Sequence, residues 1–127
     1  MLGNADAAVT IAVSDMDAAK KFYGETLGLR QENESPAGVT YKSGNSTVFV
    51  YPSEYAGSNK ATYAGWHVDN IEEVVTDLKS KGVQFEQYDN LPGATREGDI
   101  HKFGDEFAGA WFKDPFGNIL ALDNGAM

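Results

Sequence analysis

The sequence of 127 residues predicts an α+β protein built from two copies of one strand, helix and strands unit. Three observations support this prediction. Two apolar runs rich in strand-forming residues each precede a segment whose apolar residues recur at helical spacing. The residues that can cap these helices, Asp15 and Asn70, lie 55 positions apart, and the apolar positions after them keep that offset. Both copies then continue into β-rich runs joined by turn residues, which is typical of hairpins.

The first copy begins with a strand at residues 7–13, where apolar and β-branched side chains form a continuous run. Asp15 is a favourable helix cap, and from residue 16 to residue 27 the apolar side chains recur along one helical face. Gly28 ends this helix, because glycine readily takes the left-handed conformation that closes a last turn.

A β-hairpin completes the first copy. Two β-rich runs at 39–42 and 47–51 flank the turn residues SGNS. Residues after Tyr51 carry Pro, Gly, Ser and Asn without periodicity, which indicates a linker. The length is that of a single domain. Its predicted parts are a first module at about 7–51, a linker at 52–61 and a second module at about 62–123.

The second copy repeats this order with other residues. A strand is predicted at 63–68, and a helix follows Asn70 with apolar positions as far as Leu78. Gly82 ends the helix, and an extended segment follows at 83–88.

The segment from Asp89 to Glu106 is predicted to be a long loop, because it is rich in glycine and charge. Loops of this length often act as lids, and the glycines offer hinges. Phe103 and Phe107 are candidates to cover a ligand, and the alternative is that both rings pack against a neighbouring subunit.

Residues 111–122 (WFKDPFGNILAL) are predicted to close the domain as a tight hairpin. Two apolar runs flank Asp114 to Asn118. In that turn proline fixes φ, aspartate can bond its own backbone, and glycine or asparagine can take a positive φ.

Composition excludes several classes of function. The net charge is −9, and such a field repels phosphate backbones, so nucleic acid is not expected as a partner. The chain has no cysteine, which excludes disulfides, thiolate metal sites and a cysteine nucleophile. The start does not resemble a signal peptide and no apolar run reaches membrane-spanning length, so we expect a cytoplasmic protein without a membrane partner.

Three segments, VSDMDAAKKFYGETLGL, VDNIEEVVTDLKSKGV and FKDPFGNILAL, resemble the vicinal oxygen chelate superfamily. That superfamily includes glyoxalase I, extradiol dioxygenases, fosfomycin resistance enzymes and bleomycin resistance proteins. The resemblance extends from about Ala8 to Leu122. It implies two βαβββ modules that form a cupped mixed sheet with helices on the convex side. It also implies a ligand in the concavity and a homodimer.

The resemblance also implies where a divalent metal ion would be held in the metal-using members. The corresponding positions of this chain are Ala8, Phe49, Tyr63 and Ala121. Such ions take imidazole and carboxylate ligands, and two methyl groups, a phenyl ring and one phenol do not supply them. We therefore expect a protein without a metal or another cofactor. The members that dispense with metal are chiefly binding proteins of the bleomycin resistance type.

Strand alternation predicts which side chains face the cup. With Ile11 and Trp66 on the helix side, the cup would be lined mainly by aromatic rings. The predicted ligand-binding residues are Phe49, Tyr51, Tyr63, His67, Trp111, Phe103 and Phe107. An apolar cavity with few polar groups suits a partly aromatic ligand, and the alternative is that the rings fill the cup as core.

The two histidines have alternative interpretations. His67 is either a general acid or base or, more commonly for a lone strand histidine, a hydrogen-bonded wall residue. The sequence places no carboxylate beside it. His101 either reaches over the cup or is an exposed loop histidine, and exposure is favoured.

These observations favour a small-molecule-binding protein that needs no metal and binds a partly aromatic ligand. Because the protein is acidic, that ligand could also be cationic. No catalytic residue is predicted on this reading. The alternative is a metal-independent lyase or isomerase that uses His67 or Tyr63 as acid or base. A third hypothesis is a scaffold domain whose ligand site has decayed.

Overall fold

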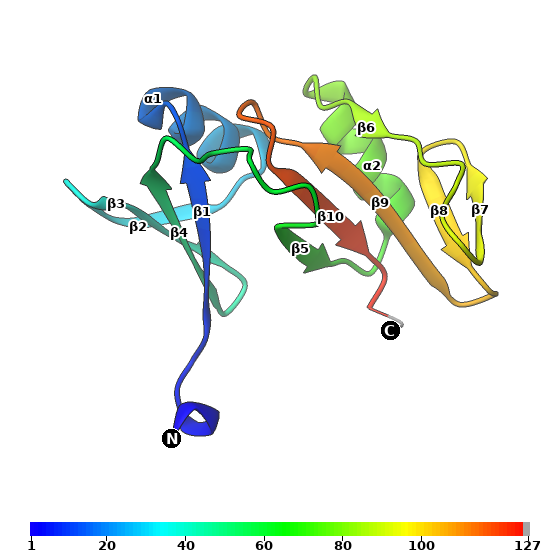
Figure 1. The fold of residues 1–127 in the computed structure, drawn as a ribbon, viewed down its shortest axis with the longest axis horizontal. Coiled ribbons are helices and arrows are strands. Elements are labelled where there is room, and N and C mark those ends of the chain that lie inside the picture. The colour runs from blue at the N-terminus through cyan, green and yellow to red at the C-terminus, as the bar shows by residue number, and fades with distance from the viewer. Residues whose placement is uncertain (126–127) are drawn as a thin grey trace. The chain divides into compact units, whose positions relative to one another are not determined.

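The computed structural model describes residues 1–125, and the chain forms two compact units (Figure 1). The first unit is Met1–Ser58, and the second begins at Asn59, within the predicted linker. Each unit contains helix and a mixed sheet, so the predicted α+β class is confirmed. Within the described residues no helix is long and apolar enough to cross a membrane.

The first unit carries a four-stranded sheet in the order β1-β4-β3-β2, with β1 and β4 parallel and the other pairs antiparallel. Its elements are η1 (Leu2–Asn4), β1 (Ala8–Val13), α1 (Met16–Ala19), η2 (Lys20–Thr26), β2 (Arg30–Ser35), β3 (Gly38–Ser43) and β4 (Ser46–Pro52). The predicted hairpin is the β3–β4 pair, and each of its strands extends one residue further at both ends than predicted. The buried core of this unit includes Ile11 of β1, Val50 of β4 and Tyr23 of the helical segment.

The predicted helix of the first unit is α-helical only in its first turn. Asp15 caps it as expected, since its side chain accepts the Ala18 N–H at 3.1 Å. From Lys20 the segment widens into a π-helix, in which the Leu27 N–H bonds the Phe22 carbonyl at 2.8 Å, five residues back. Gly24 lies in this wide turn, and a Cβ there would stand 3.7 Å from the Tyr41 ring, so the widened turn is packed against that tyrosine.

The second unit carries a larger sheet in the order β5-β10-β9-β8-β7, with β6 paired to β9 and with β5 and β10 parallel. Its elements are β5 (Ala64–His67), α2 (Ile71–Ser80), β6 (Phe85–Glu86), β7 (Ala94–Glu97), β8 (Ile100–Phe103), β9 (Phe107–Lys113) and β10 (Ile119–Asp123). Helix α2 packs against β9. The buried core of the unit includes Val75 and Leu78 of the helix with Phe112, Leu120 and Leu122 of the sheet.

The prediction of a long loop at 89–106 is wrong, while a covering role for the segment stays a prediction. The segment contains a β7–β8 hairpin that turns at Gly98, where φ is +63°. Charge and glycine suggested a loop, yet β7 is an edge strand whose Thr95 and Glu97 face solvent, so polar residues do not oppose strand formation there. Gly104 likewise takes a positive φ in the turn between β8 and β9 and is a turn residue of that connection.

The closing hairpin forms as predicted, and side chains build its turn. The buried Asp114 carboxylate accepts the backbone N–H groups of Phe116 at 2.9 Å and Asn118 at 2.8 Å. The Asn118 amide also donates to the second carboxylate oxygen at 2.8 Å. Gly117 takes a φ of +93°, as the turn prediction requires. This turn fixes the register of β9 against β10 and thus of everything that lies on them.

Candidate functional site

Strand pairing in the second unit aligns three residues in a row across neighbouring strands. Ala121 of β10 lies opposite Gly65 of β5 and opposite Trp111 of β9. Directly paired residues point to the same face of a sheet. Their chain neighbours Ala64, Leu120 and Phe112 are buried in the core, so the row lies on the sheet face away from α2. We call this the open face of the second unit.

Two small residues form the centre of this row. A Cβ built on Gly65 would stand 3.3 Å from the Ala121 carbonyl oxygen and 3.6 Å from its methyl group. The two strands therefore approach each other with no side chain larger than a methyl above them. Gly65 is exposed and Ala121 half-buried, so a planar group has room to lie over the pair.

Trp111 borders this row and is held by its neighbours. Its indole N–H donates to the Thr62 hydroxyl at 3.0 Å. Its ring meets Tyr88 edge to face, with centroids 5.7 Å apart, and His101 at 5.0 Å. Burial, and then the charge of Glu86, raises the pKa of the Tyr88 phenol, so this hydroxyl stays neutral. The half-buried indole is thus fixed in position at the edge of the small-residue centre.

Tyr63 and His67 lie on either side of Gly65 along the chain. Each is two residues from Gly65, so alternation puts both on the open face. The Tyr63 N–H bonds the Ile119 carbonyl at 2.7 Å, which continues the ladder before β5 begins. The predicted shared face of Tyr63, His67 and Trp111 therefore agrees with the strand register.

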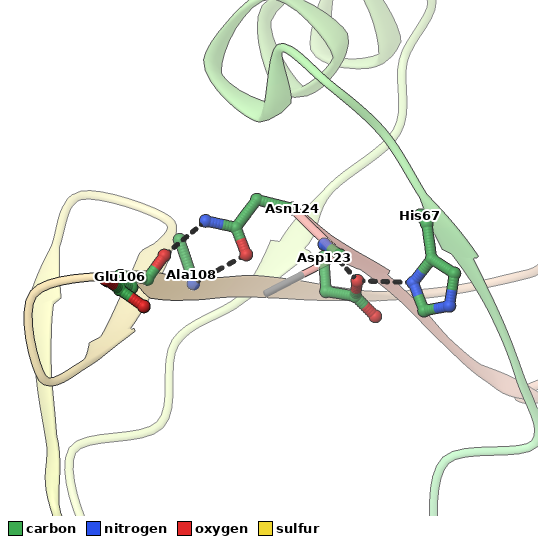
Figure 2. A network of polar contacts seen from close by, with 6 residues as sticks. His67, Glu106, Ala108, Asp123 and Asn124 are labelled. Atoms are coloured by element: carbon green, nitrogen blue, oxygen red, sulfur yellow. Dashed lines mark hydrogen bonds and ion pairs between the residues drawn. The ribbon is translucent and has the colours of Figure 1, made fainter. Parts of the chain in front are cut away.

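His67 has a carboxylate partner that the sequence did not indicate. Its Nδ1 lies 2.6 Å from Oδ1 of Asp123, at the end of β10 (Figure 2). The imidazole is 63% exposed and the carboxylate only 15%. The two residues are 56 positions apart and meet because β5 and β10 pair in parallel. Strand alternation identifies Asp123 as a neighbour of His67 only once the pairing of β5 with β10 is known.

Asn124, the residue that follows β10, makes a separate set of contacts (Figure 2). The Asn124 side chain accepts the Ala108 N–H at 3.2 Å and donates to the Glu106 carbonyl at 2.5 Å. Asn124 therefore holds the turn into β9, while Asp123 holds His67 of β5. The two consecutive residues Asp123 and Asn124 thus contact the strands on either side of β10.

The prediction that His101 is an exposed loop residue is wrong. His101 lies on β8, opposite Gly109, and is fully buried. Its Nε2 accepts the Tyr88 N–H at 2.9 Å, and within residues 1–125 its Nδ1 has no hydrogen-bond partner. Residues Ile100 to Phe103 do not alternate between apolar and polar, so this stretch carried no clear strand signal and its charged context favoured a loop.

Phe103 and Phe107 also share the open face. They are directly paired across β8 and β9, and their ring centroids are 5.5 Å apart. Both residues belong to strands of the sheet. That the rings contact a ligand stays a prediction.

The remaining predicted ligand residues lie in the first unit. Phe49 pairs with Thr10 and Tyr51 with Ala12, on the sheet face away from the helical segment. The two rings stack at 6.1 Å with an angle of 10° between them, and the Phe49 ring covers Gly38. Both rings are half-buried. That Phe49 and Tyr51 bind a ligand also stays a prediction.

The positions implied for a metal do not fit one. Thr10 pairs with Phe49 as Gly65 pairs with Ala121, which confirms that Phe49 and Ala121 are equivalent in the two units. Of the four implied positions only Tyr63 carries a donor atom. Among residues 1–125 no three His, Asp or Glu side chains come together to hold an ion. Divalent ions require such ligand sets.

Comparison with known proteins agrees with this architecture. The profile described as "Glyoxalase/Bleomycin resistance protein/Dioxygenase superfamily" matches residues 7–122. No curated protein gives a significant match.

Several solved structures resemble the chain over most of their length. One is a glyoxalase family protein from Enterococcus faecalis, at 24% identity and a TM-score of 0.68, covering 97% of this chain and 99% of that one. Another is a lactoylglutathione lyase from Agrobacterium tumefaciens, at 18% identity and a TM-score of 0.70, covering 96% and 94%. A third is the fosfomycin resistance protein FosX from Mesorhizobium loti, at 11% identity and a TM-score of 0.69, covering 98% and 94%. At these identities the likeness concerns the fold.

Proposed function

This chain belongs to the glyoxalase/bleomycin resistance protein/dioxygenase superfamily, and from that premise we propose that it binds a small, partly aromatic molecule without using a metal ion. The proposed site is the open face of the second unit. The observation that carries the proposal is the row of Gly65, Ala121 and Trp111 across three strands. Small residues beside a fixed indole provide a flat apolar surface on which a ring can stack.

Polar groups at the border of this surface would orient the ligand. His67 and Tyr63 flank the small residues on the same face, and both can exchange hydrogen bonds with a ligand heteroatom. A binding surface of this type needs few polar groups, because apolar contact supplies most of the affinity and polar groups set orientation.

The metal-free part of the proposal rests on the residues at the four implied ligand positions. Ala8, Phe49 and Ala121 cannot coordinate an ion, and Tyr63 alone would not hold one. The lyase and dioxygenase reactions that members of this superfamily carry out with a bound metal are therefore not proposed here.

Charge favours a cationic ligand over an anionic one. The chain carries 19 acidic against 10 basic residues, which attracts cations over distances of about 10 Å at moderate salt. A titration with a cationic aromatic compound and a neutral compound of the same shape tests this. Equal affinity for the two would contradict the preference for cations.

The function is tested by native mass spectrometry of the protein purified from its host. We expect a non-covalent organic adduct on the wild type and on Tyr55→Ala, in which an exposed ring away from the sheet is removed. The adduct should be absent on Trp111→Ala. A retained adduct on Trp111→Ala, or a stoichiometric divalent ion that leaves when His67 is replaced, would contradict the proposal. The same spectrum tests the homodimer that we propose from family membership.

A further inference from the structure

We propose that His67 and Asp123 form an acid–base dyad, so that the second unit moves a proton on the molecule it binds. This activity goes beyond binding, and it rests on the proposed function because the molecule must first lie on the open face. His67 would be the catalytic residue and Asp123 a positioning residue.

The contacts of Asp123 determine which imidazole nitrogen is available. Oδ1 accepts the Gly125 N–H at 2.7 Å. The same oxygen also faces His67 Nδ1 at 2.6 Å (Figure 2). An ionised carboxylate only accepts hydrogen bonds, so the proton between Oδ1 and the imidazole belongs to Nδ1. In the neutral ring Nε2 then carries the lone pair. A carboxylate that fixes the tautomer in this way prepares a histidine to act as a general base.

The two partners differ in solvent exposure, and a general base needs its reacting group to be accessible to the ligand. Asp123 is largely covered, whereas His67 is mostly exposed. The anchoring group is thus shielded from water and the reacting group faces outward. Because side chains two residues apart on a strand are separated by about 7 Å, a ring stacked over Gly65 would have an edge within reach of the imidazole.

The His67–Asp123 contact is not needed to hold β5 and β10 together. The Val68 N–H already bonds the Asp123 carbonyl at 2.7 Å, and the β5–β10 ladder extends over four residue pairs. The equivalent place in the first unit holds Ala12 and Tyr51, and β1 pairs with β4 there in the same parallel arrangement. The fold is therefore built without an ion pair at this position.

A general base beside a flat apolar surface suits a planar carbonyl compound with an acidic C–H next to the carbonyl. Nε2 would take that proton, and the electron pair of the C–H bond would move into the carbon–carbon bond as the carbonyl becomes an enolate. The imidazolium would then return its proton to another atom of the same molecule. The net change is a tautomerisation, which consumes no co-reactant.

The test measures hydrogen–deuterium exchange of 2-indanone, a planar aromatic ketone, in deuterium oxide by proton NMR. We expect the wild type to accelerate exchange above buffer, His67→Gln to lose roughly 100-fold or more of this acceleration, and Asp123→Asn to lose less. Tyr55→Phe should match the wild type. An exchange rate in His67→Gln equal to that of the wild type, or no acceleration by the wild type, would overturn the dyad.

A second measurement separates a positioning role from a structural one. Nitrogen-15 shifts of the imidazole should show a protonated Nδ1 and an unprotonated Nε2 in the wild type, and a different tautomer distribution in Asp123→Ala. An unchanged distribution would overturn the positioning role of Asp123. Titration of the same samples with the neutral dye N-phenyl-1-naphthylamine reports binding. Saturable dye binding without ketone exchange leaves the binding function standing and removes only the dyad.

Discussion

The two units pair their strands alike but fill the equivalent positions with different side chains. Where the first unit has Thr10 beside Phe49, the second has Gly65 beside Ala121. The first unit thus places a ring at a position where the second has only a methyl group. The register of the backbone was kept between the copies while the side chains of one face diverged.

A second pair of positions shows the same contrast. Ala12 beside Tyr51 in the first unit corresponds to His67 beside Asp123 in the second. The first unit has an apolar residue and a ring at these positions, whereas the second has a hydrogen-bonded imidazole and carboxylate. Duplication of one fold therefore gives two faces that differ at these paired positions. The first unit has rings at Phe49 and Tyr51, and the second has a methyl group and a carboxylate at Ala121 and Asp123. The predictions below probe this contrast through the free energy of unfolding.

The largest loss of stability is expected at the turn that sets the register of the second unit. Asp114→Ala leaves the backbone N–H groups of Phe116 and Asn118 without their acceptor. We expect a loss of about 3 kcal/mol, since several hydrogen bonds to one buried carboxylate disappear together. Urea unfolding measures it. The matched control is Asn45→Ala in the exposed β3–β4 turn, and an equal loss in both variants would contradict the account of the turn.

The second largest loss of stability is expected at Phe49, whose equivalent position in the second unit carries no ring. Phe49→Ala removes the stacked partner of Tyr51 and uncovers Gly38. Because the ring is only half-buried, we expect about 2 kcal/mol, below the range for fully buried phenylalanine. Thermal unfolding gives the value, and no change in midpoint would show that the ring does not stabilise this face.

A smaller effect is expected from Asp99, which accepts hydrogen bonds from Lys79 at 2.7 Å and Gln87 at 3.0 Å. The Lys79 contact, followed by Gln87, holds the pKa of Asp99 below its ordinary value of 3.8. A lowered folded pKa adds stability above the ordinary value, and this stability is lost as the pH falls through the folded pKa.

Asp99→Asn should therefore cost about 1 kcal/mol at pH 7 and nothing once the carboxylate of the folded wild type is protonated. Urea midpoints at neutral and acidic pH measure the difference. Glu34→Gln is the matched control in the first unit, because Lys20 lowers the pKa of Glu34 in a more exposed pair. A cost of Asp99→Asn that persists unchanged in acid would contradict this explanation.

The smallest effect is expected at Tyr41, beneath the π-helix of the first unit. Its hydroxyl is buried, and within the described part of the chain it has no hydrogen-bond partner. Tyr41→Phe should leave the free energy of unfolding unchanged or raise it by up to about 1 kcal/mol, since an unpaired polar group is removed. A clear loss of stability by urea unfolding would show that the hydroxyl has a partner, such as an ordered water.

Local patterns predicted much of the fold. The cap at Asp15, the β3–β4 hairpin and the closing turn at Asp114 depend on residues close in sequence, and each forms as predicted. The β7–β8 hairpin was missed because an edge strand carries charge without penalty, so its composition matched that of a loop. The π-helical turn contacts Tyr41, a residue distant in sequence, and local spacing did not indicate the wider turn.

The candidate site divides in the same way. Alternation along each strand predicted that Tyr63, His67 and Trp111 share a face. The partnership of His67 with Asp123 required the pairing of two strands far apart in the sequence. Long-range register is the information that a local pattern lacks.

The central claim is that the open face of the second unit binds an aromatic molecule because Gly65 and Ala121 leave it free. Ala121→Phe gives this face the ring that Phe49 provides in the first unit. Fluorescence titration with N-phenyl-1-naphthylamine should give one saturable site per chain in the wild type. We expect Ala121→Phe to weaken this binding by about 100-fold or more, equivalent to about 2.7 kcal/mol, while Phe49→Ala weakens it far less. An affinity of Ala121→Phe equal to that of the wild type would contradict the claim.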